Sequence, residues 1–128
     1  MKNTKFYICE KCGNLVELID ASGAPLVCCG QKMTELKPEA IEASREKHIP
    51  EYEINGNEVK VVVGSVLHPM AEEHSILWVA VRTDRGIHRK ELEVGKPPEA
   101  TFALHGEKPI EILAYCNLHG LWKKEINQ

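Results

Sequence analysis

Between residues 110 and 119 the chain runs Ile110-Glu111-Ile112-Leu113-Ala114-Tyr115-Cys116-Asn117-Leu118-His119. The first six residues are mostly aliphatic or aromatic, a composition typical of a β-strand. The Cys-x-x-His spacing that follows puts a thiolate and an imidazole on one loop, close enough to bind the same metal ion. The stretch therefore predicts a strand that ends at a metal site.

Four other segments after residue 57 have a strand pattern, with turn-forming residues between them. They cover residues 58–63, 76–81, 86–92 and 101–104. Strands at this spacing, without helices between them, predict an antiparallel β-sandwich. Valine, isoleucine and leucine are concentrated here, so this part of the chain can bury a hydrophobic core of its own.

The start of the chain predicts a separate, smaller module. Short strands are expected at residues 6–8, 15–19 and 25–27, with four cysteines at their ends. A module of this size cannot fold by burying apolar surface alone, so a metal or a disulfide must supply stability. We therefore divide the chain into domains 1–37 and 38–128. Residues 37–45 predict a short helical connector, with Pro38 in its first turn and Pro50 soon after its end.

Four cysteines in the small module form the first candidate metal site. Cys9 and Cys12 make a C-x-x-C knuckle, in which a tight turn brings two sulfurs to one side of an ion. Cys28 and Cys29 are adjacent, so both reach that ion only if the backbone turns sharply, and Gly30 supplies the freedom for such a turn. Four thiolates favour iron or zinc in a tetrahedral site. A disulfide between the adjacent cysteines is the alternative that needs no metal.

Four histidines and the fifth cysteine form the second candidate site. These residues are His48, His68, His74, Cys116 and His119. Four imidazoles with one thiolate suit neither a structural zinc site nor a blue-copper site. Five cysteines cannot all pair as intramolecular disulfides, and a partition of four plus one fits two metal sites. The other histidines, His88 and His105, are expected to be ordinary surface or core residues.

The charge pattern excludes several classes of partner. The 128 residues include 16 basic and 19 acidic side chains, for a net charge of −3, and the two signs are intermixed. There is no broad basic face for nucleic acid or for an anionic membrane. Neither a signal-peptide core nor a run of about 18 apolar residues follows the N-terminus. A soluble, cytoplasmic protein is therefore expected.

Short motifs around the second site resemble the desulfoferrodoxin family of superoxide reductases, in its two-iron form. The motifs are Glu46-Lys47-His48, His68-Pro69-Met70, Glu73-His74 and Cys116-Asn117-Leu118-His119-Gly120-Leu121-Trp122. The adjacent cysteines of the first site are similar to those of desulforedoxin, the iron-thiolate module at the N-terminus of this family. The resemblance covers nearly the whole chain and implies an immunoglobulin-like sandwich of seven strands after the small module.

The resemblance also implies the chemistry of both sites, with one mononuclear non-haem iron in each. The first iron would be bound by Cys9, Cys12, Cys28 and Cys29. At the second, His48, His68, His74 and His119 would lie in an equatorial plane, with Cys116 on the axis and one position open to substrate. The implied reaction is the one-electron reduction of superoxide to hydrogen peroxide. An external donor such as rubredoxin would then reduce the iron again.

Residues beside the ligands receive roles from the same resemblance. Glu46 would enter the open position of the oxidised iron, and Lys47 would attract superoxide and order water for protonation. Asn117 and Gly120 are expected to shape the ligand loop, and Trp122 to serve packing.

The family implies a homodimer, while a calcium site between subunits has no clear signature in the sequence. Two rival interpretations remain open. One is a two-iron electron-transfer protein without a substrate of its own. The other is a zinc-ribbon binding module, for which the acidic balance offers nucleic acid little to bind.

Overall fold

The computed structural model describes residues 4–40, 48–64 and 68–127. Within these residues every regular element is a β-strand, and no helix is long and apolar enough to cross a membrane. The chain divides into two compact units, Met1–Lys37 and Pro38–Gln128. The predicted fold class, a small module with four cysteines followed by a larger antiparallel β domain, is confirmed.

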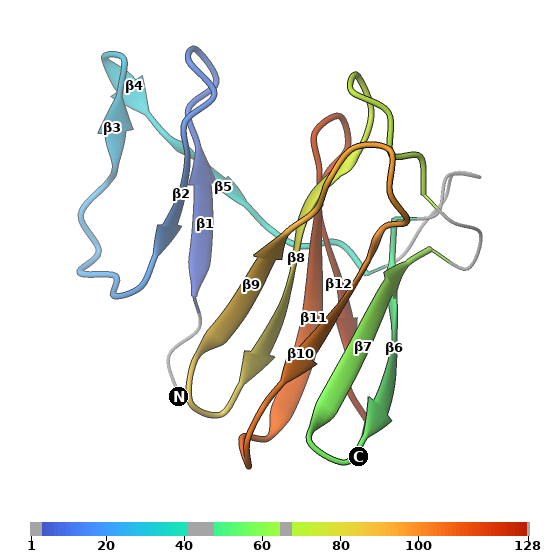
Figure 1. Ribbon diagram of the computed structural model, residues 1–128. Coiled ribbons are helices and arrows are strands. Elements are labelled where there is room, and N and C mark those ends of the chain that lie inside the picture. Colours follow the sequence, from blue (N-terminus) through green and yellow to red (C-terminus); the bar gives the residue numbers. More distant parts are fainter. Residues whose placement is uncertain (1–3, 41–47, 65–67, 128) are drawn as a thin grey trace. The chain divides into compact units, whose positions relative to one another are not determined.

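The smaller unit consists of a three-stranded antiparallel sheet and a separate hairpin (Figure 1). The sheet has the order β2-β1-β5, and the hairpin pairs β3 with β4. These strands are β1 (Lys5–Ile8), β2 (Leu15–Leu18), β3 (Val27–Cys28), β4 (Gln31–Lys32) and β5 (Thr34–Leu36). Phe6 and Cys9 are the buried hydrophobic residues in the described part of this unit. So small a core agrees with the expectation that a bound metal supplies stability.

The larger unit contains two antiparallel sheets, with the orders β10-β7-β6 and β12-β11-β8-β9 (Figure 1). Their strands are β6 (Pro50–Asn55), β7 (Glu58–Val63), β8 (Ile76–Thr83), β9 (Ile87–Glu91), β10 (Glu99–Ala103), β11 (Pro109–Cys116) and β12 (Gly120–Glu125). Because side chains alternate between the faces of a strand, β7 buries Val59, Val61 and Val63 and leaves Glu58 and Lys60 exposed. These valines pack with aliphatic residues of the second sheet, which include Ile76, Val79, Val81, Ile112 and Ala114.

The sequence patterns do not predict four of the observed strands, β4, β5, β6 and β12. β6 begins at Pro50, a residue expected to follow the end of a helical connector. Proline is tolerated as the first residue of a strand because its missing N–H is not needed there. β12 overlaps the ligand motif that ends at Trp122. Its first residues belong to that motif, so no strand is predicted there.

The helical connector is wrong for residues 37–40, the part of it that the structure describes. Glu39 instead forms an isolated parallel bridge with Trp122. The Glu39 amide donates to the Leu121 carbonyl at 3.0 Å, and the Lys123 amide donates to the Glu39 carbonyl at 2.8 Å. β12 is the last strand of its sheet, and its outward backbone groups need partners. An extended connector supplies them, whereas a helix would not. Residues 41–47 lie outside the described residues.

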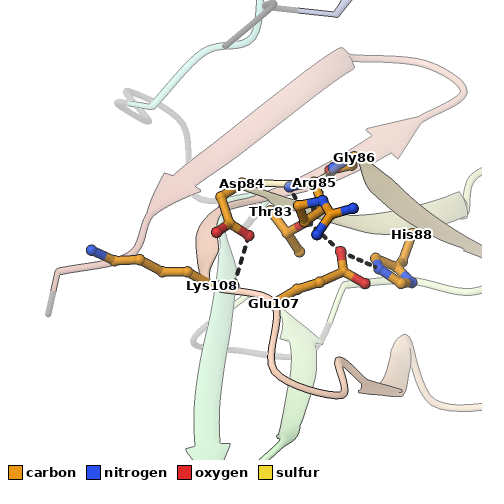
Figure 2. A network of polar contacts seen from close by, with 7 residues as sticks. All are labelled: Thr83, Asp84, Arg85, Gly86, His88, Glu107 and Lys108. Atoms are coloured by element: carbon orange, nitrogen blue, oxygen red, sulfur yellow. Dashed lines mark hydrogen bonds and ion pairs between the residues drawn. The ribbon is translucent and has the colours of Figure 1, made fainter.

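A polar network ties the β8–β9 turn to the loop between β10 and β11 (Figure 2). The buried Thr83 hydroxyl donates to Glu107 Oε1 at 2.6 Å, and His88 Nε2 lies 3.1 Å from the same oxygen. On the other side of the turn, Asp84 Oδ1 accepts from the Lys108 amide at 2.9 Å. His88 is therefore part of a structural network. Neither it nor the exposed His105 belongs to a cluster of ligand atoms in the described residues.

Two candidate metal centres

The first centre, the thiolate cluster, gathers Cys9, Cys12, Cys28 and Cys29, whose sulfur atoms all lie within 4.8 Å of one another. Cys9 directly follows β1 and begins a tight turn, in which the Gly13 amide donates to the Cys9 carbonyl at 2.9 Å. Gly13 has a φ of +83°, a conformation that glycine adopts without strain. The turn points both knuckle sulfurs toward the β3–β4 hairpin, where Cys12 Sγ is 3.6 Å from Cys28 Sγ.

The adjacent cysteines are accommodated by the turn between β3 and β4. Cys28 pairs with Gln31, so Cys29 and Gly30 are the two residues of the turn. Both have positive φ, 53° for Cys29 and 76° for Gly30, as a type I′ turn requires. This sharp reversal leaves the sulfurs of Cys28 and Cys29 only 4.0 Å apart. Neighbouring side chains of an extended strand would point to opposite faces instead.

The spacing of the sulfurs fits a tetrahedral metal ion. Metal–sulfur bonds of about 2.3 Å in a tetrahedron put the sulfurs about 3.8 Å apart. The observed separations of 3.6 Å and 4.0 Å bracket that value. N–H groups also face the sulfurs: the Cys12 amide is 3.5 Å from Cys9 Sγ, and Asn14 Nδ2 is 3.6 Å from Cys28 Sγ.

The protonation of the thiolate cluster also favours a cation. The Cys12 backbone N–H lowers the pKa of Cys9 to about 6, against the effect of burial. Hydrogen bonds with the sulfurs of Cys12, Cys9 and Cys28 raise the pKa of Cys29 to about 12. The thiolate form is thus favoured at Cys9, whereas the pKa values of Cys28 and Cys29 are raised. All four sulfurs become thiolates together only when a metal ion neutralises their charge.

The second centre, the histidine cluster, is formed by residues from four separate segments of the larger unit. His48 precedes β6, His68 follows β7, and His74 lies two residues before β8. Cys116 ends β11, and His119 lies in the turn before β12. His48, His68 and Cys116 are at most 3% exposed, whereas His119 is exposed to solvent. The centre is therefore walled by protein on several sides and borders solvent at His119.

The four imidazole rings stand at the corners of a near-square. Neighbouring ring centroids are 4.7 Å apart for His48–His68, His68–His74 and His48–His119, and 5.2 Å apart for His74–His119. The His48–His74 diagonal is 6.4 Å. Cys116 Sγ lies 3.8 Å from His119 Nδ1 and within 4.8 Å of ligand atoms of the other three histidines. One sulfur is thus within reach of every imidazole.

The distances of this cluster also fit a metal ion. Two imidazole nitrogens at right angles, each about 2.0–2.1 Å from an ion, stand about 2.9 Å apart. His48 Nε2 and His119 Nδ1 are separated by 2.9 Å. His68 Nδ1 lies 2.8 Å from the Pro69 carbonyl, so it carries the proton and leaves Nε2 as the acceptor nitrogen.

Trp122, expected to serve only packing, contacts two of the candidate ligands. Its ring stacks on the His48 imidazole at a centroid distance of 4.7 Å and an angle of 13°. Its indole N–H donates to the His119 carbonyl at 3.1 Å. The three-residue spacing between His119 and Trp122 is a signal for the second contact, but nothing in the sequence indicates the stacking on His48.

The structure brings the nine predicted ligand residues together in two clusters. The two predicted catalytic residues, Glu46 and Lys47, lie outside the described residues. Gly120, expected to shape the ligand loop, has a φ of +84° and allows the chain to turn directly after His119 into β12.

Comparison with known proteins accounts for both units. The desulfoferrodoxin family model matches residues 40–125, and the model of the desulfoferrodoxin N-terminal domain matches residues 2–36. A desulfoferrodoxin homolog of Archaeoglobus fulgidus is 45% identical over 91% of this chain and 93% of the relative. Desulfoferrodoxin of Nitratidesulfovibrio vulgaris is 44% identical over 94% of this chain and 95% of the relative.

Solved structures agree with the sequence comparison. The superoxide reductase of Treponema pallidum superposes with a TM-score of 0.83 and 38% identity, over 96% of this chain and 98% of that one. A one-iron superoxide reductase of Giardia intestinalis covers 66% of this chain, with a TM-score of 0.58 and 30% identity. The chain belongs to the desulfoferrodoxin family, of which it carries both the N-terminal domain and the larger domain.

Proposed function

We propose that this protein is an iron-dependent superoxide reductase, which reduces superoxide to hydrogen peroxide without releasing dioxygen. The observation that carries the proposal is the near-square of four imidazoles with the buried Cys116 sulfur beside it. Family membership and the named superoxide reductases among the similar structures support it. Reduction is completed by an external donor, for which we propose a rubredoxin-like protein.

We propose iron for both centres, with Cys9, Cys12, Cys28 and Cys29 as ligands of the first, and His48, His68, His74, His119 and Cys116 as ligands of the second. Iron at the second centre would supply the electron and a Lewis-acidic position for superoxide. Conversion of superoxide to hydrogen peroxide takes up one electron and two protons. The solvent border at the exposed His119 is the side from which a small anion and those protons reach the centre.

The chain's own residues set the conditions for this chemistry. Cys116 contributes a negative thiolate in a buried position, where its charge acts strongly on a neighbouring cation. Trp122 and the Pro69 carbonyl fix the orientation of His48 and His68. The histidine cluster is therefore organised by contacts within the protein.

Several finer points belong to the proposal. Lys47 draws superoxide toward the second centre, and Glu46 closes the open position after the product leaves. Domain 1–37 binds the first iron, and domain 38–128 carries out catalysis. We propose a homodimer in the cytoplasm.

The test is a stoichiometric reaction of the reduced, iron-loaded protein with superoxide under anaerobic conditions. Each oxidised iron of the second centre should yield one hydrogen peroxide and no dioxygen. Cys116→Ser should lose the reaction, because a serine hydroxyl is largely protonated and is a poor ligand. His105→Ala, at an exposed residue outside both clusters, should match the parent. Release of dioxygen would indicate dismutation. Oxidation by a protein acceptor but not by superoxide would indicate an electron-transfer protein.

A further inference from the structure

Asn117 lies between the ligands Cys116 and His119 but bonds to a different segment. Its Oδ1 accepts from the Ser75 amide at 3.0 Å, and its Nδ2 donates to the Glu73 carbonyl at 3.1 Å. Its own backbone amide donates to the Ser75 carbonyl at 3.2 Å. The residue thus makes three hydrogen bonds to the two residues that flank His74.

The side-chain amide of Asn117 forms the same pair of hydrogen bonds with this segment that a backbone peptide group of a neighbouring strand would form. A peptide group offers one donor and one acceptor, and a primary amide offers both in one plane. Aspartate has the acceptor but no donor, and alanine has neither. The Ser75 amide is buried, so an acceptor opposite it matters more than it would at an exposed position. The contacts therefore require the amide itself.

The segment that carries His74 is short and exposed on one side. Ala71 and His74 bond to each other through both backbone groups, at 3.0 Å and 3.1 Å, with the exposed Glu72 and Glu73 forming the turn between them. Asn117 holds the last residue of this turn and the first residue after His74. It therefore fixes the position at which His74 leaves the turn, relative to Cys116 in the neighbouring loop.

We propose that Asn117 is a positioning residue for the second centre, which holds His74 at its corner of the imidazole square before a metal binds. The inference deepens the proposed function, but it requires only that the histidine cluster binds a metal. Its test therefore uses cobalt(II) binding and no superoxide. A protein that does not reduce superoxide could still use Asn117 to position His74. A protein in which Asn117 has no such role could still reduce superoxide.

The decisive experiment is a double-mutant cycle on cobalt(II) affinity, with Asn117→Ala, His74→Ala and the double variant. The spectrum of a variant that keeps the thiolate cluster but has Cys116→Ser and alanine at His48, His68, His74 and His119 is subtracted, so that only the second centre is followed. Removal of a residue that orients a ligand costs roughly 10- to 100-fold in metal affinity. We expect a loss of this size for Asn117→Ala when His74 is present, and a loss of about twofold or less when it is absent. Equal losses in both backgrounds would overturn the proposal.

The ligand-field bands of bound cobalt provide a readout that a loss of stability alone would not change. At saturating cobalt, Asn117→Ala should shift these bands toward those of His74→Ala. Asn117→Asp should behave like Asn117→Ala, because it lacks the donor and turns a second oxygen toward the Glu73 carbonyl. If Asn117→Asp kept the cobalt affinity and the ligand-field bands of the parent, the proposed role of the hydrogen bonds to Glu73 and Ser75 would be contradicted. Asn55→Ala is the matched control, since Asn55 bonds only to the exposed Glu53 among the contacts described for its side chain, and it should leave cobalt binding unchanged.

A measurement on the metal-free parent makes the test independent of how the variants fold. If the hydrogen bond from the Ser75 amide to Asn117 exists before metal binds, this amide should exchange slowly with solvent in the metal-free protein. Rapid exchange there would show that metal binding creates the contacts, and the proposal would be wrong.

Discussion

At the scale of single residues, Asn14 brings a neutral hydrogen-bond donor to the thiolate cluster. Its Nδ2 lies 3.6 Å from Cys28 Sγ. With the iron that we propose for this centre, an N–H that faces a thiolate stabilises the reduced site, whose net charge is more negative, more than the oxidised site. The lost hydrogen bond is worth about 0.5–1 kcal/mol. We therefore expect Asn14→Ala to lower the reduction potential of the first centre by roughly 20–45 mV for a one-electron couple.

Redox titration followed at the absorption of the ferric thiolate site measures this shift. The second centre should keep its potential and serves as an internal control. Asn14→Asp removes the donor and adds a negative charge, so it should lower the first potential further. An unchanged potential in both variants would show that the Asn14 contact does not tune the iron.

The residue types and their spacing predict which side chains form the two clusters, because few residues are good ligands for iron or zinc. They do not predict the contacts that orient the ligands. Asn117 reaches Ser75, which is 42 positions earlier in the chain. Trp122, in β12, stacks on His48, which precedes β6. Such contacts depend on strand register and packing, which local patterns do not encode.

At the scale of elements, the turn after β8 is held by a charged group in another loop. Glu107 accepts hydrogen bonds from Thr83 and His88 (Figure 2), and these bonds hold the pKa of its carboxyl below the ordinary value. The ionised form therefore favours the folded state at pH values above the pKa of the unfolded chain, about 4.3. That stability is lost as the pH falls through the lower pKa of the folded protein.

Urea unfolding of the parent and Glu107→Gln across pH 3–7 tests this network. The parent should be more stable than Glu107→Gln above about pH 5, and the difference should shrink below about pH 4. Glu99→Gln, at an exposed position of β10, should show no such trend. A difference between parent and Glu107→Gln that stays constant with pH would mean that the carboxylate charge contributes nothing to folding.

Strand patterns predict the central strands of the larger unit, but they miss β6 and β12, two of its four edge strands. β7, β8 and β11 supply most of the core and have long aliphatic runs. β6 and β12 are edge strands of their sheets and carry many exposed or half-buried charges. The hydrophobic pattern of these two strands is therefore too weak to predict a strand. The prediction of a helical connector is wrong for a related reason. The backbone hydrogen bonds between Glu39 and β12 are tertiary contacts, and they override the helix signals around Pro38.

At the scale of the whole molecule, composition along the chain predicts the fold class. Four of the five cysteines lie between residues 9 and 29, whereas the long aliphatic strands begin after residue 57. A chain with this division forms one unit that depends on a metal and one that depends on a hydrophobic core. The family model for each unit agrees with that division of the fold.

Net charge poses a problem for the proposed reaction, because the chain carries −3 and the substrate is an anion. Fast capture requires local attraction that exceeds this global repulsion. Lys47 directly precedes His48, a proposed ligand, and is the residue that we propose as the source of this attraction. A unit charge about 6 Å from an anion contributes about 0.7 kcal/mol at the permittivity of water, which corresponds to roughly threefold in rate.

We therefore expect Lys47→Ile to slow the second-order reaction with superoxide roughly threefold or more at low ionic strength, and to flatten its salt dependence. Pulse radiolysis measures both quantities. Lys47→Arg should retain most of the rate. Lys108→Ile is the matched control, because it changes the net charge equally but lies just before β11, whose eight residues separate it from the second centre by about 25 Å. Even without screening, a unit charge at that distance contributes only about 0.17 kcal/mol at the permittivity of water, which is roughly 1.3-fold in rate. Equal slowing by Lys47→Ile and Lys108→Ile would mean that net charge governs capture, and Lys47 would then have no special role in guiding superoxide.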